Sequence, residues 1–181
     1  MLLDTPRCHV GWQAPDFTLQ DPEGARHTLA ENLGENGLLI AFICNHCPYV
    51  KAIARRFVSD AQALQVEGIS VLAIMSNDYR AVPEDSPANM ARFSQQFGFS
   101  FPYLVDEEQT VARAYGAVCT PDFFGFNAAG ELQYRGRLDD ARMGDPANRT
   151  KELVSAMMQI KDTGRGPDQQ FSSMGCSIKW R

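Results

Sequence analysis

The stretch that decides the fold reads LLIAFICNHCP and runs from Leu38 to Pro48. Its first part, residues 38–43, is an uninterrupted apolar run, which predicts a strand buried on both faces, as parallel sheets require. From Val50 to Leu64 apolar residues recur every three or four positions, which predicts an amphipathic helix. The two cysteines of the stretch are therefore expected in the turn between a buried strand and a helix N-terminus.

The sequence on either side predicts an α/β chain. Residues 69–75 form a second apolar strand, so strand, helix and strand predict a right-handed crossover and a parallel pair. Further expected elements are a hairpin over 16–29, a helix over 88–97, a strand over 103–105, a helix over 110–115, a hairpin of 122–126 with 131–135, and a helix over 152–160. We expect a central mixed sheet flanked by helices, with an N-terminal β-hairpin, in one domain over residues 1–164, and a polar C-terminal extension over residues 165–181.

Composition limits the function classes. The 181 residues, 44% hydrophobic and 22% charged, fit one globular domain, and a net charge of −5 disfavours nucleic acid as a partner. The longest apolar run, Leu38 to Cys44, is far shorter than the ~18 residues that span a bilayer, so we expect no membrane association. The N-terminus carries no secretory pattern, and five cysteines are too few and too unevenly spaced for a disulfide framework. A cytoplasmic location is expected.

The motif Cys44-Asn45-His46-Cys47 carries the chemistry. The first turn of a helix has unpaired N–H groups and roughly half a positive charge, which stabilises a thiolate. Cys44, at the exposed mouth of the motif, is predicted to attack a disulfide, and Cys47 to resolve the mixed disulfide. A structural zinc site would need two further ligands in a second motif that the chain lacks, and a pair of inert buried cysteines is the remaining plain reading.

Five stretches carry a family resemblance: APDFTL (Ala14–Leu19), CNHCPYVK (Cys44–Lys51), CTPDFF (Cys119–Phe124), YRGRLDD (Tyr134–Asp140) and GCSIKW (Gly175–Trp180). With them the sequence resembles the thioredoxin-fold superfamily, and within it the redoxin group of thiol reductases and peroxiredoxins. It is similar to a bacterial subfamily labelled thioredoxin family protein. The resemblance implies a thioredoxin-like fold, a cis Thr120–Pro121 bond facing the cysteines, and thiol–disulfide oxidoreductase activity without a cofactor or metal. Thr120 and Pro121 would then bind an extended substrate as an added strand.

His46 is predicted to act on the redox pair. A partly positive imidazole near the Cys44 sulfur would favour its thiolate and make the disulfide more oxidising than that of thioredoxin. The other reading is a solvent-exposed histidine with little effect. Two family features are absent, because Ile43 stands where thioredoxin has a tryptophan before the first cysteine, and an apolar run including Leu38 replaces its buried acid. The usual base for Cys47 is thus missing.

Two alternative functions remain open. Cys47 followed by Pro48 matches the peroxide-attacking cysteine of peroxiredoxins, with Arg135 or Arg137 to polarise the peroxide, although these arginines equally fit a solvated strand face. A Cu(I) metallochaperone would use Cys44, Cys47 and Cys119 as soft ligands.

The remaining cysteines are interpreted separately. Cys119 is either a small buried hydrophobic residue or a third redox partner, Cys176 lies on a tail that could reach back as a resolving thiol, and Cys8 is given no role. The expected partners are a protein disulfide, a small thiol or a peroxide, together with a cellular thiol reductant.

Overall fold

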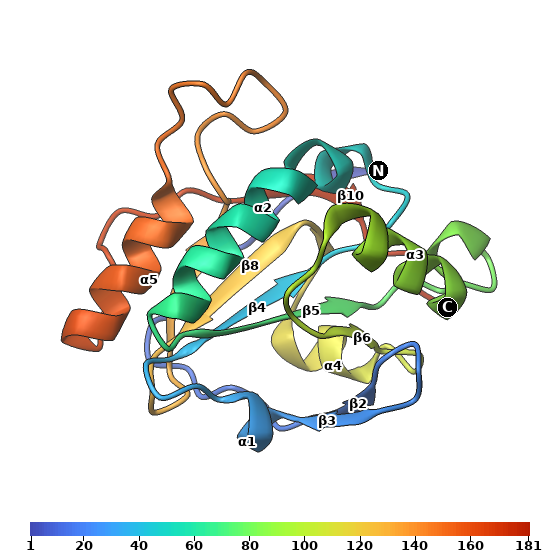
Figure 1. Cartoon of the computed structure of the whole chain (residues 1–181), viewed down its shortest axis with the longest axis horizontal. Coiled ribbons are helices and arrows are strands. Elements are labelled where there is room, and N and C mark those ends of the chain that lie inside the picture. The colour runs from blue at the N-terminus through green and yellow to red at the C-terminus, as the bar shows by residue number, and fades with distance from the viewer.

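A seven-stranded mixed sheet forms the centre of the molecule in the computed structural model, which describes residues 1–181 (Figure 1). The strand order is β3-β2-β6-β5-β4-β8-β9, and the strands are β2 (Thr18–Gln20), β3 (Arg26–Thr28), β4 (Leu38–Phe42), β5 (Ser70–Met75), β6 (Tyr103–Val105), β8 (Asp122–Phe126) and β9 (Leu132–Gly136). Strand β4 lies parallel to β5 and antiparallel to β8, and all five of its residues are buried. The position of β4 in the middle of the sheet, covered on both faces, explains why its sequence is apolar throughout.

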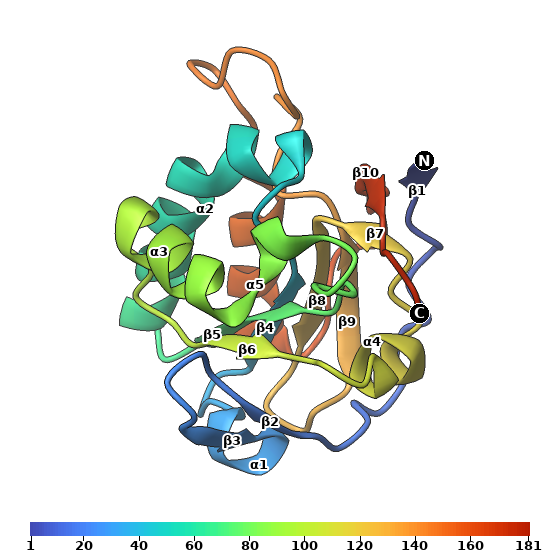
Figure 2. The same ribbon diagram turned by 90° about the vertical axis from the view of Figure 1, so that its right-hand side faces the viewer.

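Helices cover both faces of this sheet (Figures 1 and 2). They are α1 (Leu29–Asn32), α2 (Pro48–Val66), α3 (Pro87–Phe97), α4 (Thr110–Tyr115) and α5 (Glu152–Thr163), with a single 3₁₀ turn, η1 (Pro83–Asp85). The apolar sides of α2, α3 and α5 join one hydrophobic core with Cys44 and Cys47, whereas α4 packs in a second core on the opposite face. The predicted hairpins, strands and longer helices are confirmed to within a few residues. No helix combines the length and the apolarity that crossing a bilayer requires.

A second, three-stranded sheet was not expected from the sequence. It has the order β1-β10-β7, with β1 (Leu2–Asp4), β7 (Cys119–Thr120) and β10 (Met174–Ser177), and lies to one side of the central sheet (Figure 2). The segment predicted to be a polar tail therefore contains a strand. Gly175 permits this, because a Cβ atom there would overlap the Thr120 carbonyl oxygen. Strand β10 thus lies closer to β7 at this position than a residue with a side chain would permit.

The two arginines of β9 and its following turn are not on a solvated strand face, as one reading of the sequence proposed. Arg135 is 6% exposed and forms an ion pair with the fully buried Asp122, over the ring of Phe124. Asp122 and Phe124 are two residues apart on β8 and so point to the same face, where Phe124 belongs to the core that contains neither Cys44 nor Cys47. Arg135 therefore lies on the wrong face to polarise a peroxide at the redox motif. Arg137 pairs instead with Glu152.

Candidate active site

Cys44 and Cys47 lie between β4 and α2, as the sequence predicted. Cys47 is the N-cap residue of α2 and Pro48 occupies its first turn, a position that suits proline. Both cysteines are reduced and both are 0% exposed. The expectation that Cys44 lies at an exposed mouth is therefore wrong, because the neighbouring segments 119–121 and 174–177 pack over the motif.

Thr120 contacts both sulfurs. Its hydroxyl lies 3.2 Å from Cys44 Sγ, and its carbonyl oxygen accepts a hydrogen bond of 3.3 Å from Cys47 Sγ. The Thr120–Pro121 bond is cis, which confirms what the family resemblance implied. The backbone of Thr120 is not free for an added peptide, however, since it pairs antiparallel with Cys176 of β10. The chain's own strand occupies the position at which a substrate strand was expected.

Hydrogen bonding between the two buried thiols shifts their pKa values in opposite directions. Hydrogen bonding from Cys44, and then from Cys176, lowers the pKa of Cys47 although burial opposes this, and the N–H group of Val50 adds to the effect. The pKa of Cys44 is raised by its hydrogen bond to Cys47, by burial and by the nearby Asp85 carboxylate. When the pair loses a proton, the thiolate is therefore concentrated on Cys47, whereas the sequence-based interpretation placed it on Cys44.

Asp85 is a buried carboxylate beside the motif that sequence reasoning missed. One of its oxygens accepts the backbone N–H groups of Asn45 and His46, at 2.7 and 3.2 Å. The other lies 2.6 Å from His46 Nδ1 and accepts from Asn77 Nδ2 at 2.8 Å. Asp85 belongs to an acid-rich loop without periodicity, so only its proximity in space reveals its role.

His46 interacts mainly with this carboxylate. The hydrogen bond to Asp85 raises the pKa of His46, and burial opposes the rise. Burial alone would raise the pKa of Asp85, but hydrogen bonds from His46 and Asn77 lower it. The two groups therefore favour the imidazolium–carboxylate form. The His46 ring, 24% exposed, offsets the negative charge that Asp85 would otherwise present to Cys44.

One set of side chains could hold a metal ion. Ligand atoms of Cys44, His46 and Asp85 lie within 4.8 Å of one another. Both oxygens of the carboxylate already accept hydrogen bonds, so a metal would have to displace them. Cys119 is not part of this set, and the structure does not assemble the cluster of Cys44, Cys47 and Cys119 that a Cu(I) site would need.

The other three cysteines differ in their relation to the site. Burial, then the Asp122 carboxylate, raises the pKa of Cys119 to about 12, which suits an inert buried residue. Cys8 lies near Arg135 rather than near the redox motif. Cys176 packs against the core that contains the motif, and burial, followed by hydrogen bonding with Cys47, raises the pKa of its thiol to about 11. Of the additional thiols, the structure brings only Cys176 to the site.

Comparisons with known proteins show which chains this protein resembles. The chain is 40% identical to an uncharacterised conserved protein from Geobacillus kaustophilus, whose crystal structure superposes with a TM-score of 0.94 over 100% of this chain and 97% of that one. It is 28% identical over 131 residues to thiol-disulfide oxidoreductase ResA of Geobacillus thermodenitrificans, covering 68% of this chain and 67% of that protein.

A Mycobacterium tuberculosis protein provisionally named a peroxiredoxin is 25% identical over 160 residues, which is 88% of this chain and 91% of that protein. A family model described as the AhpC/TSA family matches residues 10–135, the part of the chain that carries the central sheet, both cysteines and the cis-proline loop. This match covers well over half of the chain. The protein therefore belongs to the AhpC/TSA family.

Proposed function

We propose that this protein is a thiol–disulfide oxidoreductase in which Cys44 and Cys47 form the redox pair. The observation that carries the proposal is the placement of two cysteine sulfurs at the N-terminus of α2, both within 3.3 Å of Thr120 atoms in the cis-proline loop. Loss of two electrons would join the sulfurs, since two intervening residues allow a small disulfide ring. The named oxidoreductase relative supports the same chemistry.

Peroxidase activity is the second candidate. The lowered pKa of Cys47 favours it, because peroxide is attacked by a thiolate. Arg135 cannot assist, since it is paired with Asp122 in the opposite core. Thiol–disulfide exchange, which needs only two sulfurs and a thiolate, is therefore the better-supported function. The physiological reductant, an antioxidant role and a cytoplasmic location stay predictions.

The proposed function is tested by equilibrating the purified chain in glutathione redox buffers. A Cys44–Cys47 disulfide is expected to form reversibly with the dependence of a two-electron couple, as followed by acid quenching and peptide mass mapping. A Cys119→Ser variant is the matched control and should titrate as the wild type does. A protein that retains stoichiometric copper or zinc and forms no Cys44–Cys47 disulfide would contradict the proposal.

His46 is expected to make the pair more oxidising. In a His46→Ala variant the Asp85 charge faces Cys44 without compensation, so the thiolate form of the pair is destabilised and its apparent pKa rises. A tenfold loss of thiolate stability corresponds to a reduction potential lower by about 30 mV. Titration against glutathione and thiolate absorbance measure the two shifts separately. A His46→Ala/Asp85→Asn variant, which removes both charges, should recover much of the loss, and unchanged values in His46→Ala would assign His46 no electrostatic role.

A further inference from the structure

Three sulfurs, rather than two, meet at the N-terminus of α2. Thr120 is the residue that links them: its hydroxyl lies 3.2 Å from Cys44 Sγ, its carbonyl oxygen lies 3.3 Å from Cys47 Sγ, and it pairs with Cys176 of β10, which packs against the core that holds the motif. Hydrogen bonding with Cys44 and with Cys176 lowers the pKa of the Cys47 thiol, which agrees with this placement. Cys44 follows β4, whereas Cys176 belongs to β10, so these two cysteines come from distant parts of the chain. Cys47 is therefore the common neighbour, and a disulfide between Cys47 and either of the other two cysteines would join residues that the fold already places beside Thr120.

The three sulfurs differ in access from outside. Cys44 and Cys47 are 0% exposed, while Cys176 is half-buried on a strand at the surface of the molecule. Strand β10 fills the edge beside Thr120 through which a disulfide would otherwise approach the pair. Of the three sulfurs at this site, Cys176 is therefore the first that a reagent unable to enter the core can reach.

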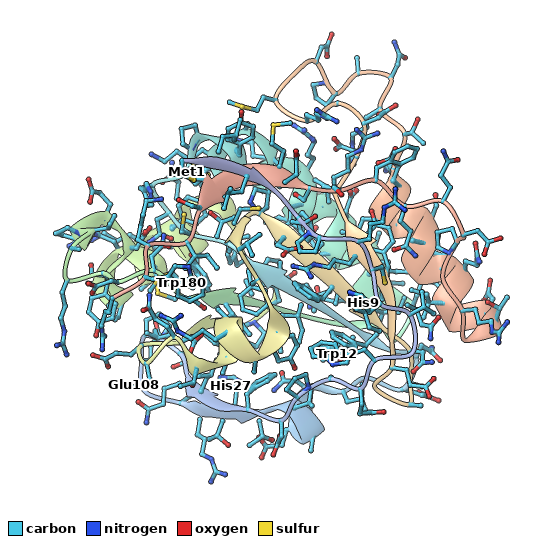
Figure 3. The ribbon with its side chains drawn as sticks, turned by 180° about the vertical axis from the view of Figure 1, so that it is seen from behind. Met1, His9, Trp12, His27, Glu108 and Trp180 are labelled. Atoms are coloured by element: carbon cyan, nitrogen blue, oxygen red, sulfur yellow. The ribbon has the colours of Figure 1, made fainter.

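Strand β10 is firmly held. Lys179 donates its backbone N–H to Asn77 Oδ1 at 2.8 Å, and the same Asn77 donates to Asp85. The ring of Trp180 lies 4.3 Å from the guanidinium carbon of Arg113 in α4. On the edge of β10 that faces β1, the backbone N–H of Ser177 donates a hydrogen bond to the Met1 carbonyl oxygen; Figure 3 labels Met1 and Trp180. These contacts fix Cys176 against Cys47 and argue against a tail that swings away freely.

We propose that Cys176 is a third redox thiol, which passes disulfide bonds between an external low-molecular-weight disulfide and the buried Cys44–Cys47 pair. The proposal rests on the proposed function. The substrate class follows from the occupied edge at Thr120, because an extended polypeptide cannot pair with that strand while β10 does, whereas a small disulfide needs to reach only Cys176.

The reaction balances in three exchanges. Cys176 attacks the external disulfide RSSR, forms Cys176–S–S–R and releases one thiolate. Cys47 attacks the Cys176 sulfur, forms a Cys47–Cys176 disulfide and releases the second thiolate. Cys44 attacks Cys47, forms the Cys44–Cys47 disulfide and returns Cys176 to its reduced state. Two electrons pass from the buried pair to RSSR. With Cys47 starting as the thiolate, the protons of Cys44 and Cys176 complete two molecules of RSH, and Cys176 is left as the thiolate, which takes a proton from solvent.

The hydrogen bonds supply a path for these protons. Burial and donation to the Cys47 thiolate raise the pKa of Cys176 to about 11, so the thiol needs a base before it attacks. When the pair is deprotonated, the Cys47 thiolate can take that proton, because hydrogen bonding between the two residues lowers the pKa of Cys47 and raises the pKa of Cys176. Lys179 and the N-terminal ammonium group favour the Cys176 thiolate that forms. The first released thiolate then takes the proton from Cys47, which frees Cys47 for the second exchange.

The rate of oxidation by oxidised glutathione tests the relay in the full-length chain. In Cys176→Ser the Cys44–Cys47 disulfide should form at about one tenth of the wild-type rate or more slowly still, because direct attack on the buried pair requires β10 to open locally. The Cys44–Cys47 disulfide should still form to completion in excess oxidised glutathione, because Cys176 is not one of its two sulfurs. Cys119→Ser, a substitution on the neighbouring strand β7, is the matched control and should react at the wild-type rate. Quenched samples are analysed by peptide mass mapping.

A second variant captures the intermediate. Cys44→Ser should stop at a Cys47–Cys176 disulfide, and Cys44→Ser/Cys176→Ser should stop as a chain carrying one glutathione on Cys47. Wild-type or faster oxidation of Cys176→Ser would overturn the relay while leaving the proposed function intact, as would a Cys44→Ser chain that forms no Cys47–Cys176 disulfide. A wild-type chain that forms no Cys44–Cys47 disulfide would overturn both.

Discussion

A Cys47→Ser variant is expected to lose thiol–disulfide turnover almost completely, by about a thousandfold or more, because residues that act as a unit cannot replace one another. Cys47 is the second cysteine of the motif, and its loss leaves Cys44 without its partner for the buried disulfide. The measurement is the dithiothreitol-driven reduction of oxidised glutathione, corrected for the uncatalysed exchange.

Two further variants define what that loss means. Cys44→Ser should also lose turnover, since its chain cannot complete the buried disulfide, whereas Cys119→Ser should retain it. Cys119 is as fully buried as the redox pair, so the comparison controls for the introduction of a hydroxyl into the core. Substantial turnover by Cys47→Ser would show that the chemistry does not pass through the Cys44–Cys47 pair.

The largest loss of stability is expected from Arg135→Met. Arg135 and Asp122 form an ion pair of 2.7 Å at 6% and 0% side-chain exposure, and Arg135 also donates to the Gly116 carbonyl oxygen at 2.8 Å. Removing the arginine leaves a buried carboxylate without its counter-ion, which typically costs about 3–5 kcal/mol in the free energy of unfolding. Urea unfolding measures the change.

The pH dependence of that loss has a definite sign. Burial raises the pKa of Asp122 to about 6 even with Arg135 opposing the rise, and without Arg135 it rises further. A carboxyl group with a folded-state pKa above its unfolded value contributes stability at low pH that is lost as pH rises through the folded value. Arg135→Met should therefore be less destabilising at pH 5 than at pH 8.

Two comparisons complete the stability experiment. Arg135→Met/Asp122→Leu removes both charges and should recover most of the loss, because apolar replacement of a buried ion pair is often neutral. Arg137→Met breaks the more exposed pair with Glu152 and should cost only about 1 kcal/mol. Equal losses for Arg135→Met and Arg137→Met at pH 8 would refute the assignment of a special cost to the buried pair.

The central part of the fold could be predicted because its signals are local. The apolar run of β4, the helical spacing of α2 and the glycines after α3 and α4 each determine one element from a few neighbouring residues. The redox motif was found for the same reason, since Cys44 and Cys47 are neighbours in sequence. The cis bond before Pro121 required the family resemblance, because proline alone does not specify the isomer.

The rest of the site depends on contacts between residues far apart in sequence. Asp85 reaches His46 across 39 positions, and Cys176 pairs with Thr120 through two short strands that lack a repeating pattern. Arg135 could not be assigned to a face, because its partner Asp122 becomes its neighbour only when β8 and β9 pair. The predicted exposure of Cys44 was wrong because β10, which covers it, was taken for an extension.

The three-stranded sheet also bears on the order in which the molecule folds. Strands β1, β7 and β10 join residues 2–4, 119–120 and 174–177, so their pairing closes long loops, whereas β4, α2 and β5 are consecutive. Contacts of large sequence separation carry the greater entropic cost of closure and tend to form late. The N-terminus of α2 would then be assembled while its thiols still face solvent. A refolding chain would pass through a stage at which alkylating or oxidising reagents reach sulfurs that the native fold conceals.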